Sequence, residues 1–116
     1  MISAPIRVSY ISVAVEGEAP ISAQGNQRTG AWIAGEHKIL IRCDLPPAEQ
    51  AATLMHELIH AIYSTYALKG RRLGEEDVCC QLEGPLVAVF TDNPWLAGVL
   101  HQAVNHGVPI VKPTLH

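Results

Sequence analysis

The sequence is poor in three features that would each point to a particular class of protein: cysteine, clustered positive charge and long apolar runs. It has three cysteines in 116 residues, two of them adjacent, which makes a poor disulfide framework and favours a reducing cytoplasm. Eight Lys and Arg against eleven Asp and Glu give a net charge of −3, and no basic cluster exceeds Lys69, Arg71 and Arg72. We therefore expect no nucleic-acid partner, because proteins that bind nucleic acids carry a basic surface.

The longest apolar stretch, residues 86–100, is interrupted by the polar residues 91–94 and is not expected to cross a membrane. The first five residues lack the basic segment and apolar core of a signal peptide. A hydrophobic content of 48% with 16% charged residues is typical of a globular protein. These observations predict a single domain over residues 1–116, located in the cytoplasm and without a membrane partner.

One stretch carries recognisable chemistry: residues 53–62 contain His-Glu-x-x-His within a helical pattern. Residues four apart on an α-helix lie one above the other, so His56 and His60 project from the same face. Two such imidazoles can share one Zn²⁺, and Glu57, about 100° around the helix, can reach a metal-bound water. The opposite side of this helix is apolar, with Ala51, Leu54, Met55, Leu58 and Ile62. The sequence therefore predicts a zinc site on one face and core contacts on the other.

The rest of the chain predicts an α+β fold. The β-branched segment 6–15 predicts one strand, residues 23–30 a loop, and residues 31–42 a β-hairpin that turns at 35–37. We expect a zincin-like arrangement, in which a short antiparallel sheet packs on the motif helix.

Three helices are expected after the hairpin. The motif helix spans about 47–68, with Asp44 as a candidate cap; a second helix runs from 75 or 76 to about 90. Gly84-Pro85 in the second helix allows a kink or a short break. A third helix spans about 94–105, with Asn93 as a candidate cap.

A catalytic zinc has three protein ligands, so one more is needed besides the two histidines. The second helix offers carboxylates at 75, 76, 77 and 83, and its apolar stripe sets their phase. The stripe consists of Val78, Cys79, Leu82, Leu86 and Val89, which also predicts Cys79 as a small core residue. Glu75 continues the stripe by one turn, whereas Glu76 lies about 80–100° to the side. We expect Glu75 as the third ligand and Glu76 as the alternative, with His101 and His106 as more distant candidates.

Several segments together carry a resemblance to a known family. The sequence Thr-Leu-x-His-Glu-Leu-Ile-His-Ala at 53–61 is followed by Glu-Glu at 75–76 and by Asp-Asn-Pro at 92–94, and it is preceded by Gly30 and the apolar strand 38–41. Over about 29–94 this pattern resembles small phage and prophage zinc-metallopeptidase-like proteins, distant relatives of the ImmA/IrrE and gluzincin-type peptidases.

The resemblance implies a zincin-like fold, His56 and His60 as zinc ligands, Glu57 as general base, and a glutamate of the second helix as third ligand. The chain departs from the ImmA/IrrE pattern beyond that glutamate. It has Val-Cys-Cys-Gln-Leu at 78–82, where that family usually has Ala-Asn-x-Phe-Ala. This departure leaves the register of the third ligand open.

The motif predicts hydrolysis of a peptide or protein substrate. With zinc bound, the open position holds a water whose pKa falls towards neutrality, and Glu57 accepts its proton and passes it to the leaving amine. Strand 38–42 leads into the motif helix, and we expect it to be the edge strand to which an extended substrate adds.

A second interpretation belongs to another functional class. In it the chain is a catalytically silent zincin-fold binding protein, a phage or prophage regulator whose metal is structural. The small size favours this alternative, whereas Glu57 favours the enzyme, because a structural site needs ligands and no base. The sequence predicts neither the cleavage preference nor the oligomeric state.

Overall fold

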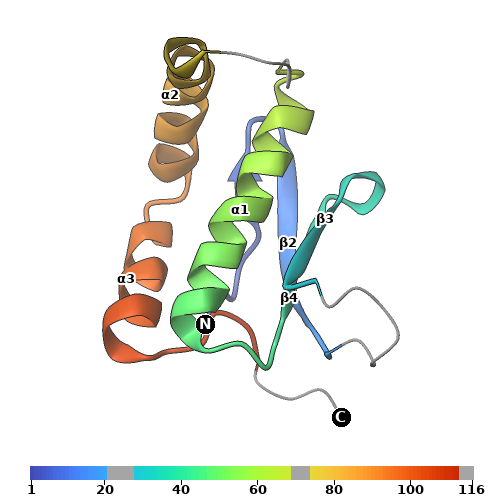
Figure 1. The fold of residues 1–116 in the computed structure, drawn as a ribbon, viewed down its shortest axis with the longest axis vertical. Helices are drawn as coiled ribbons and strands as arrows, with labels where there is room; N and C mark the ends of the chain where they lie inside the picture. Colours follow the sequence, from blue (N-terminus) through green and yellow to red (C-terminus); the bar gives the residue numbers. More distant parts are fainter. Residues whose placement is uncertain (21–27, 69–73, 113–116) are drawn as a thin grey trace.

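The computed structural model describes residues 1–20, 28–68 and 74–112, and it shows an α+β fold in which helix α1 lies against a four-stranded sheet (Figure 1). The elements, in chain order, are β1 (Ile6–Val8), β2 (Ile11–Glu18), β3 (Gly30–Ile33), a 3₁₀ turn η1 (Ala34–Glu36), β4 (Lys38–Arg42), α1 (Pro47–Thr65), α2 (Glu75–Asp92) and α3 (Leu96–His106). The fold class is therefore α+β, as predicted.

The sheet is mixed, so the prediction of an antiparallel sheet is wrong in one pairing. The strand order is β1-β2-β4-β3, with antiparallel pairs at both ends and a parallel pair, β2 with β4, between them. Each antiparallel pair joins strands that are neighbours in the sequence, and the local pattern predicted the β3–β4 pair. The parallel pair joins strands separated by β3, and no local pattern indicates it.

The single strand predicted over 6–15 is in fact the hairpin β1–β2, with a turn at Ser9 and Tyr10. Ser9 has a positive φ of 55°, and Tyr10 is 77% exposed. The buried positions change phase at the turn, from Ile6 and Val8 to Ile11 and Val13. That change of phase was the missed signal, because a continuous strand keeps one parity of residues on its buried face. The second strand also extends to Glu18, beyond the predicted end.

The hairpin predicted around 35–37 is confirmed. Its strands β3 and β4 are antiparallel, and the turn consists of η1 followed by His37, whose φ is 52°. The predicted loop 23–30 lies mostly outside the described residues, and β3 already begins at Gly30. Strand β4 is flanked by β2 and β3, so the expectation that 38–42 forms the edge is wrong. The strand at this edge of the sheet is β3.

Helix α1 packs its apolar side on the sheet, as its spacing predicts. Leu54, Leu58 and Ile62 are fully buried and belong to the same core cluster as Ile39 and Ile41 of β4. The motif helix begins at the expected place but ends at Thr65, and the predicted stop at 69–70 lies outside the described residues.

The start of α1 differs from the prediction in its cap. The cap residue is Pro46, and Pro47 occupies the first helical position, where a missing N–H does no harm. Asp44 instead accepts a hydrogen bond from Nε of Arg42 at 2.7 Å. The Asp44 carboxylate therefore pairs with Arg42 and does not cap α1.

Gln50, at the base of α1, joins the chain's last described residues to the core. Its side chain is almost fully buried; Oε1 accepts hydrogen bonds from the backbone N–H of Ile110 (2.8 Å) and Val111 (3.2 Å). Its Nε2 donates to the carbonyl of Leu45 at 3.0 Å and, more weakly, to that of Cys43 at 3.5 Å. One amide thus satisfies backbone groups from two separate segments, 43–45 and 110–111.

Helix α2 is continuous through Gly84-Pro85, so no break occurs there. Of its predicted apolar stripe only Val89 is buried, and Cys79 is exposed, so the prediction that Cys79 lies in the core is wrong. In the first half of this helix Val78 and Leu82 are half-buried, and Leu82 packs against the core cluster.

Asn93 does not cap the third helix, contrary to the prediction. Its side-chain oxygen accepts the N–H of Arg7 at 2.8 Å, and its Nδ2 donates to the carbonyls of Arg7 (2.8 Å) and Val89 (2.7 Å). Helix α3 begins at Leu96, with Trp95 as cap residue. Asn93 thereby attaches the end of α2 to β1.

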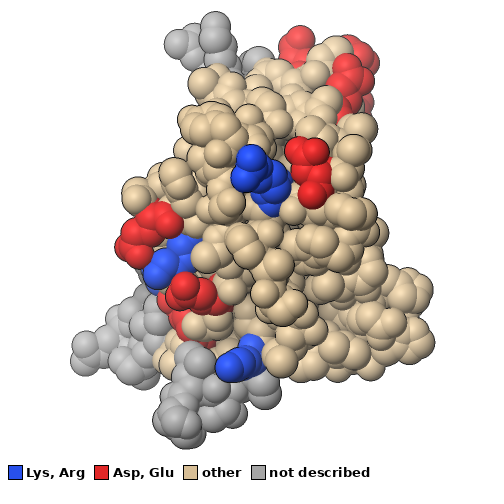
Figure 2. Space-filling model, turned by 180° about the vertical axis from the view of Figure 1, so that it is seen from behind, with Lys and Arg blue, Asp and Glu red and all other residues tan. Residues whose placement is uncertain are grey.

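On the face of the molecule shown in Figure 2, some basic and acidic side chains lie beside one another, a group of acidic side chains at the top lies apart from any basic one, and most of the surface is uncharged. In the sheet region, Nζ of Lys38 forms ion pairs with two carboxylates, at 3.1 Å from Glu36 and 3.5 Å from Glu16. Within residues 1–20, 28–68 and 74–112, no helix is long and apolar enough to cross a membrane.

Candidate metal centre

The structure brings His56, Glu57 and His60 together on α1. One potential ligand atom from each residue lies within 4.8 Å of the other two. The two imidazole centroids are 5.0 Å apart with the rings 69° from parallel, and Nε2 of His56 is 3.9 Å from Oε2 of Glu57. Ligand atoms that share one zinc at about 2.0–2.1 Å stand roughly 3–4 Å apart. Both histidines are exposed, so small side-chain rotations can bring them to that spacing. The group could therefore hold a metal ion.

Glu57 differs from its histidine neighbours in burial. Its side chain is 9% exposed, whereas that of His56 is 68% exposed. Glu57 follows His56 on α1, and its side chain lies between this helix and strand β3. Its Cγ would be 3.5 Å from a Cβ added to Gly30. A carboxylate held in this place is restricted in its motion, while the histidines face solvent.

Gly30 permits the close approach of β3 and α1 that encloses Glu57. A Cβ at this position would lie 2.6 Å from the carbonyl oxygen of Leu40 and 2.6 Å from Cγ2 of Thr53, both too close. Since Gly30 has no side chain, the edge strand can lie directly against the helix.

A hollow of about 420 Å³ opens beside this group. It is lined by β3 and the residues before it on one side and by α1 on the other: Arg28, Thr29, Gly30, Ala52, Thr53, His56 and Glu57. The hollow therefore gives a small molecule or a peptide access to His56 and Glu57.

Arg28 contributes the positive charge of this hollow. Its Nε and Nη2 donate to the two carboxylate oxygens of Glu18, at 3.1 and 2.8 Å. These hydrogen bonds raise the pKa of the Arg28 guanidinium, and attraction to the carboxylates of Glu18 and Glu57 acts in the same direction. No sequence pattern indicated Arg28, because it lies within the predicted polar loop 23–30 and reaches the hollow only through the fold.

The third-ligand candidates are not part of this group. Glu75 and Glu76 lie in the first turn of α2, and the group of metal-capable side chains found in the described residues contains neither. Glu76 accepts a hydrogen bond from Sγ of Cys80 at 3.6 Å, and Asp77 accepts one from the N–H of Gly74 at 3.3 Å. The assignment of Glu75, with Glu76 as alternative, stays a prediction.

The remaining histidine candidates lie elsewhere. His101 and His106 are exposed on α3, with ring centroids 5.6 Å apart, and Nδ1 of His101 is 3.2 Å from Nδ2 of Asn105. Neither belongs to the group on α1. His37 is exposed at the hairpin turn and stacks with Trp32 at 6.5 Å.

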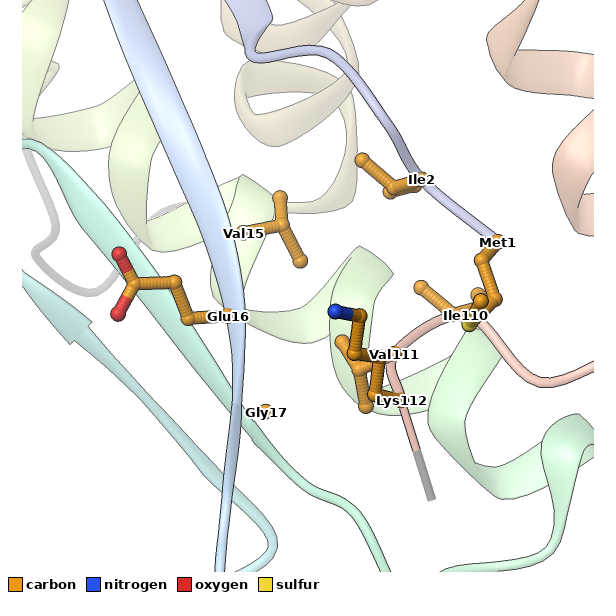
Figure 3. Close-up of a pocket in the computed structure, with 8 residues that line it drawn as sticks. All are labelled: Met1, Ile2, Val15, Glu16, Gly17, Ile110, Val111 and Lys112. Atoms are coloured by element: carbon orange, nitrogen blue, oxygen red, sulfur yellow. The ribbon is translucent and has the colours of Figure 1, made fainter. Parts of the chain in front are cut away.

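A second hollow, of about 360 Å³, lies between β2 and the two ends of the described chain (Figure 3). Its lining is mostly aliphatic, with one acidic and one basic residue: Met1, Ile2, Val15, Glu16, Gly17, Ile110, Val111 and Lys112. It contains no histidine or cysteine, and the potential ligands on α1 are not among its lining residues. The motif residues His56 and Glu57 line the other hollow, beside β3.

Comparisons with protein-family models, with curated proteins and with solved structures give no match. Any functional conclusion for this chain therefore rests on its own residues.

Proposed function

We propose that the chain is a zinc-dependent metallopeptidase that hydrolyses peptide bonds, with His56 and His60 as zinc ligands and Glu57 as general base. The observation that supports it is the convergence of these three side chains within 4.8 Å, beside a hollow that reaches the molecular surface. Two imidazoles four residues apart that bind zinc, with a neighbouring carboxylate as base, are the groups that such hydrolysis uses.

Zinc bound there would supply Lewis-acid activation of a water and of the scissile carbonyl. Glu57 would take the proton of the attacking water on its carboxylate and deliver it to the leaving amine. Its burial beside Gly30 supports this role, because a base with restricted motion keeps its distance to the reacting water.

The substrate would lie along β3, in place of strand 38–42 that the sequence suggested. β3 is the last strand of the sheet order, so its outer edge is unpaired within the described residues. An extended peptide can hydrogen-bond to such an edge and present its carbonyl to the neighbouring helix face.

Metal content is the first test. Purified wild-type protein should bind one zinc per chain, and His60→Ala should lose it. His101→Ala, which removes an exposed histidine of α3, is the matched control and should keep the zinc. A wild-type protein that binds no zinc without chelators present would contradict the proposal.

The same measurement assigns the third ligand. Glu75→Gln should weaken zinc binding if the prediction from helical phase is right, and Glu76→Gln should do so if the alternative holds. If both variants bind zinc as tightly as wild type, neither residue is the third ligand.

Hydrolysis distinguishes the enzyme from the binding protein. Glu57→Gln should retain zinc and lose roughly 10²–10⁴-fold in turnover of a mixed peptide library, as expected for loss of a general base. Zinc binding without any hydrolysis by the wild type would favour the silent zincin-fold regulator instead.

A further inference from the structure

Arg28 is the one basic side chain among the residues that line the hollow beside the metal-capable group. The other lining residues are small or polar apart from His56 and Glu57. A ligand in this hollow would therefore meet His56 and Glu57 of α1 on one side and the Arg28 guanidinium on the side of β3. The hollow therefore combines a cationic group, which can bind an anion, with the metal-capable side chains of α1.

The guanidinium is only partly used by its ion pair. Nε and Nη2 donate to the Glu18 carboxylate, which occupies one edge of the planar group. The N–H groups of Nη1 make no hydrogen bond to another described residue, and the side chain is 44% exposed. Arg28 can thus bind a second acceptor without releasing the first.

The strand ladder holds Arg28 in position. Glu18 ends β2, and its carbonyl accepts the N–H of Cys43 at 2.9 Å. The carbonyl of Thr29, next to Arg28, accepts the N–H of Arg42 at 2.8 Å. Both the partner carboxylate and the backbone beside Arg28 are therefore fixed to the same sheet, so the charge has a defined place.

We propose that Arg28 binds a carboxylate of the substrate and so makes the enzyme selective for peptides with a carboxylate close to the scissile bond. This inference rests on the proposed peptidase function and names its substrate class. The carboxylate can come from the end of the peptide or from an acidic side chain; both present the same two oxygens to the guanidinium.

The test uses zinc-loaded protein and small zinc-binding probes rather than an unidentified substrate. Monohydroxamates of malonic, succinic and glutaric acid carry a zinc-binding group and a carboxylate at three separations. Their amides lack only the charge. We expect at least one acid to bind about tenfold more tightly than its amide in calorimetry, as for a charge-assisted hydrogen bond.

Arg28→Gln should remove the preference for the acid and leave the affinity for the amide unchanged. Arg28→Lys should keep part of the preference, because it retains the charge without the planar fork. Arg42→Gln is the matched control: Arg42, the last residue of β4, also pairs with a carboxylate, that of Asp44, but does not line the hollow, so the preference should persist.

The two sources of carboxylate are then separated with peptides. Turnover of peptides with a free C-terminal carboxylate is compared with that of amidated peptides containing glutamate at successive positions. The preferred substrate should show a raised KM with an unchanged kcat in Arg28→Gln.

Equal binding of acid and amide at all three lengths in the wild type, or a preference that survives in Arg28→Gln, would overturn the role of Arg28 while the peptidase stands. If no hydroxamate of either kind binds the zinc-treated protein, the proposed function fails and this substrate class with it.

Discussion

Helices α1 and α2 are almost equal in length and differ greatly in burial. Eight of the 19 residues of α1 are buried, whereas Val89 alone is buried among the 18 residues of α2. The first helix has the sheet on one side and α3 as a further neighbour; the second contacts β1. The molecule thus has a firmly packed helix that carries the motif and a second helix whose first half is largely exposed.

This difference explains which site predictions the structure supports. His56, Glu57 and His60 lie on one packed helix, so their mutual positions follow from spacing alone. A ligand at Glu75 or Glu76 would also require α2 to lie in one position against α1, which helical phase within α2 cannot supply. The predictions that follow test this contrast, from the largest expected effect to the smallest.

The same substitution should have very different costs in the two helices. Leu58→Ala removes a fully buried side chain of α1 and should reduce the free energy of unfolding by about 2–5 kcal/mol. Leu82→Ala on α2, where the side chain is half-buried, should cost only about 1 kcal/mol. Urea denaturation measures both, and equal losses would contradict the contrast.

The end of α2 should be the exception within that helix. Asn93→Ala removes two hydrogen bonds to Arg7 of β1 and one to Val89 of α2, and should cost about 2–3 kcal/mol, because part-buried backbone groups of Arg7 lose their partners. Hydrogen exchange in β1 should become faster. Asn105→Ala, at an exposed position of α3, is the control and should stay within about 0.5 kcal/mol of wild type.

Close packing of α1 against β3 can be tested at Gly30. Gly30→Ala places a methyl group 2.6 Å from a carbonyl oxygen and from Thr53, and should cost about 1–3 kcal/mol in thermal or urea unfolding. Gly98→Ala in α3 meets nothing within 4 Å and should stabilise the helix by up to about 1 kcal/mol. A neutral Gly30→Ala would mean that β3 and α1 do not touch here.

The smallest effect concerns a thiol on the exposed helix. The hydrogen bond to Glu76 raises the pKa of Cys80, so less thiolate is present at any pH below that pKa. Glu76→Gln should therefore lower the pKa and speed alkylation by iodoacetamide a few-fold, measured in a Cys79→Ser background. Cys43 is buried and should react only on unfolding. Slow alkylation of Cys80 in both proteins would show that α2 is covered.

Local patterns were sufficient for much of the fold. The motif helix, its buried side, the β3–β4 hairpin and the span of the second and third helices all follow from spacing and turn residues. The hairpin at Ser9 was missed because its residues resemble the strands on either side, although the buried positions change parity there.

What could not be predicted depends on contacts distant in sequence. The parallel β2–β4 pair, the bonds of Asn93 to Arg7 and the entry of Arg28 into the hollow each join residues that no local pattern connects. Asp44 and Asn93 also show that a polar residue before a helix caps it only if no other partner competes.

The buried amide of Gln50 also determines how far this chain can be shortened from its C-terminal side in a fragment produced for study. A truncation before Ile110 would leave Oε1 of Gln50 without its two backbone donors and would remove a fully buried side chain from the core. A tag joined beyond Lys112 would leave those contacts in place. Expression boundaries should therefore include Val111, and shortened versions that end earlier are expected to be poorly folded even if they contain the whole of α1.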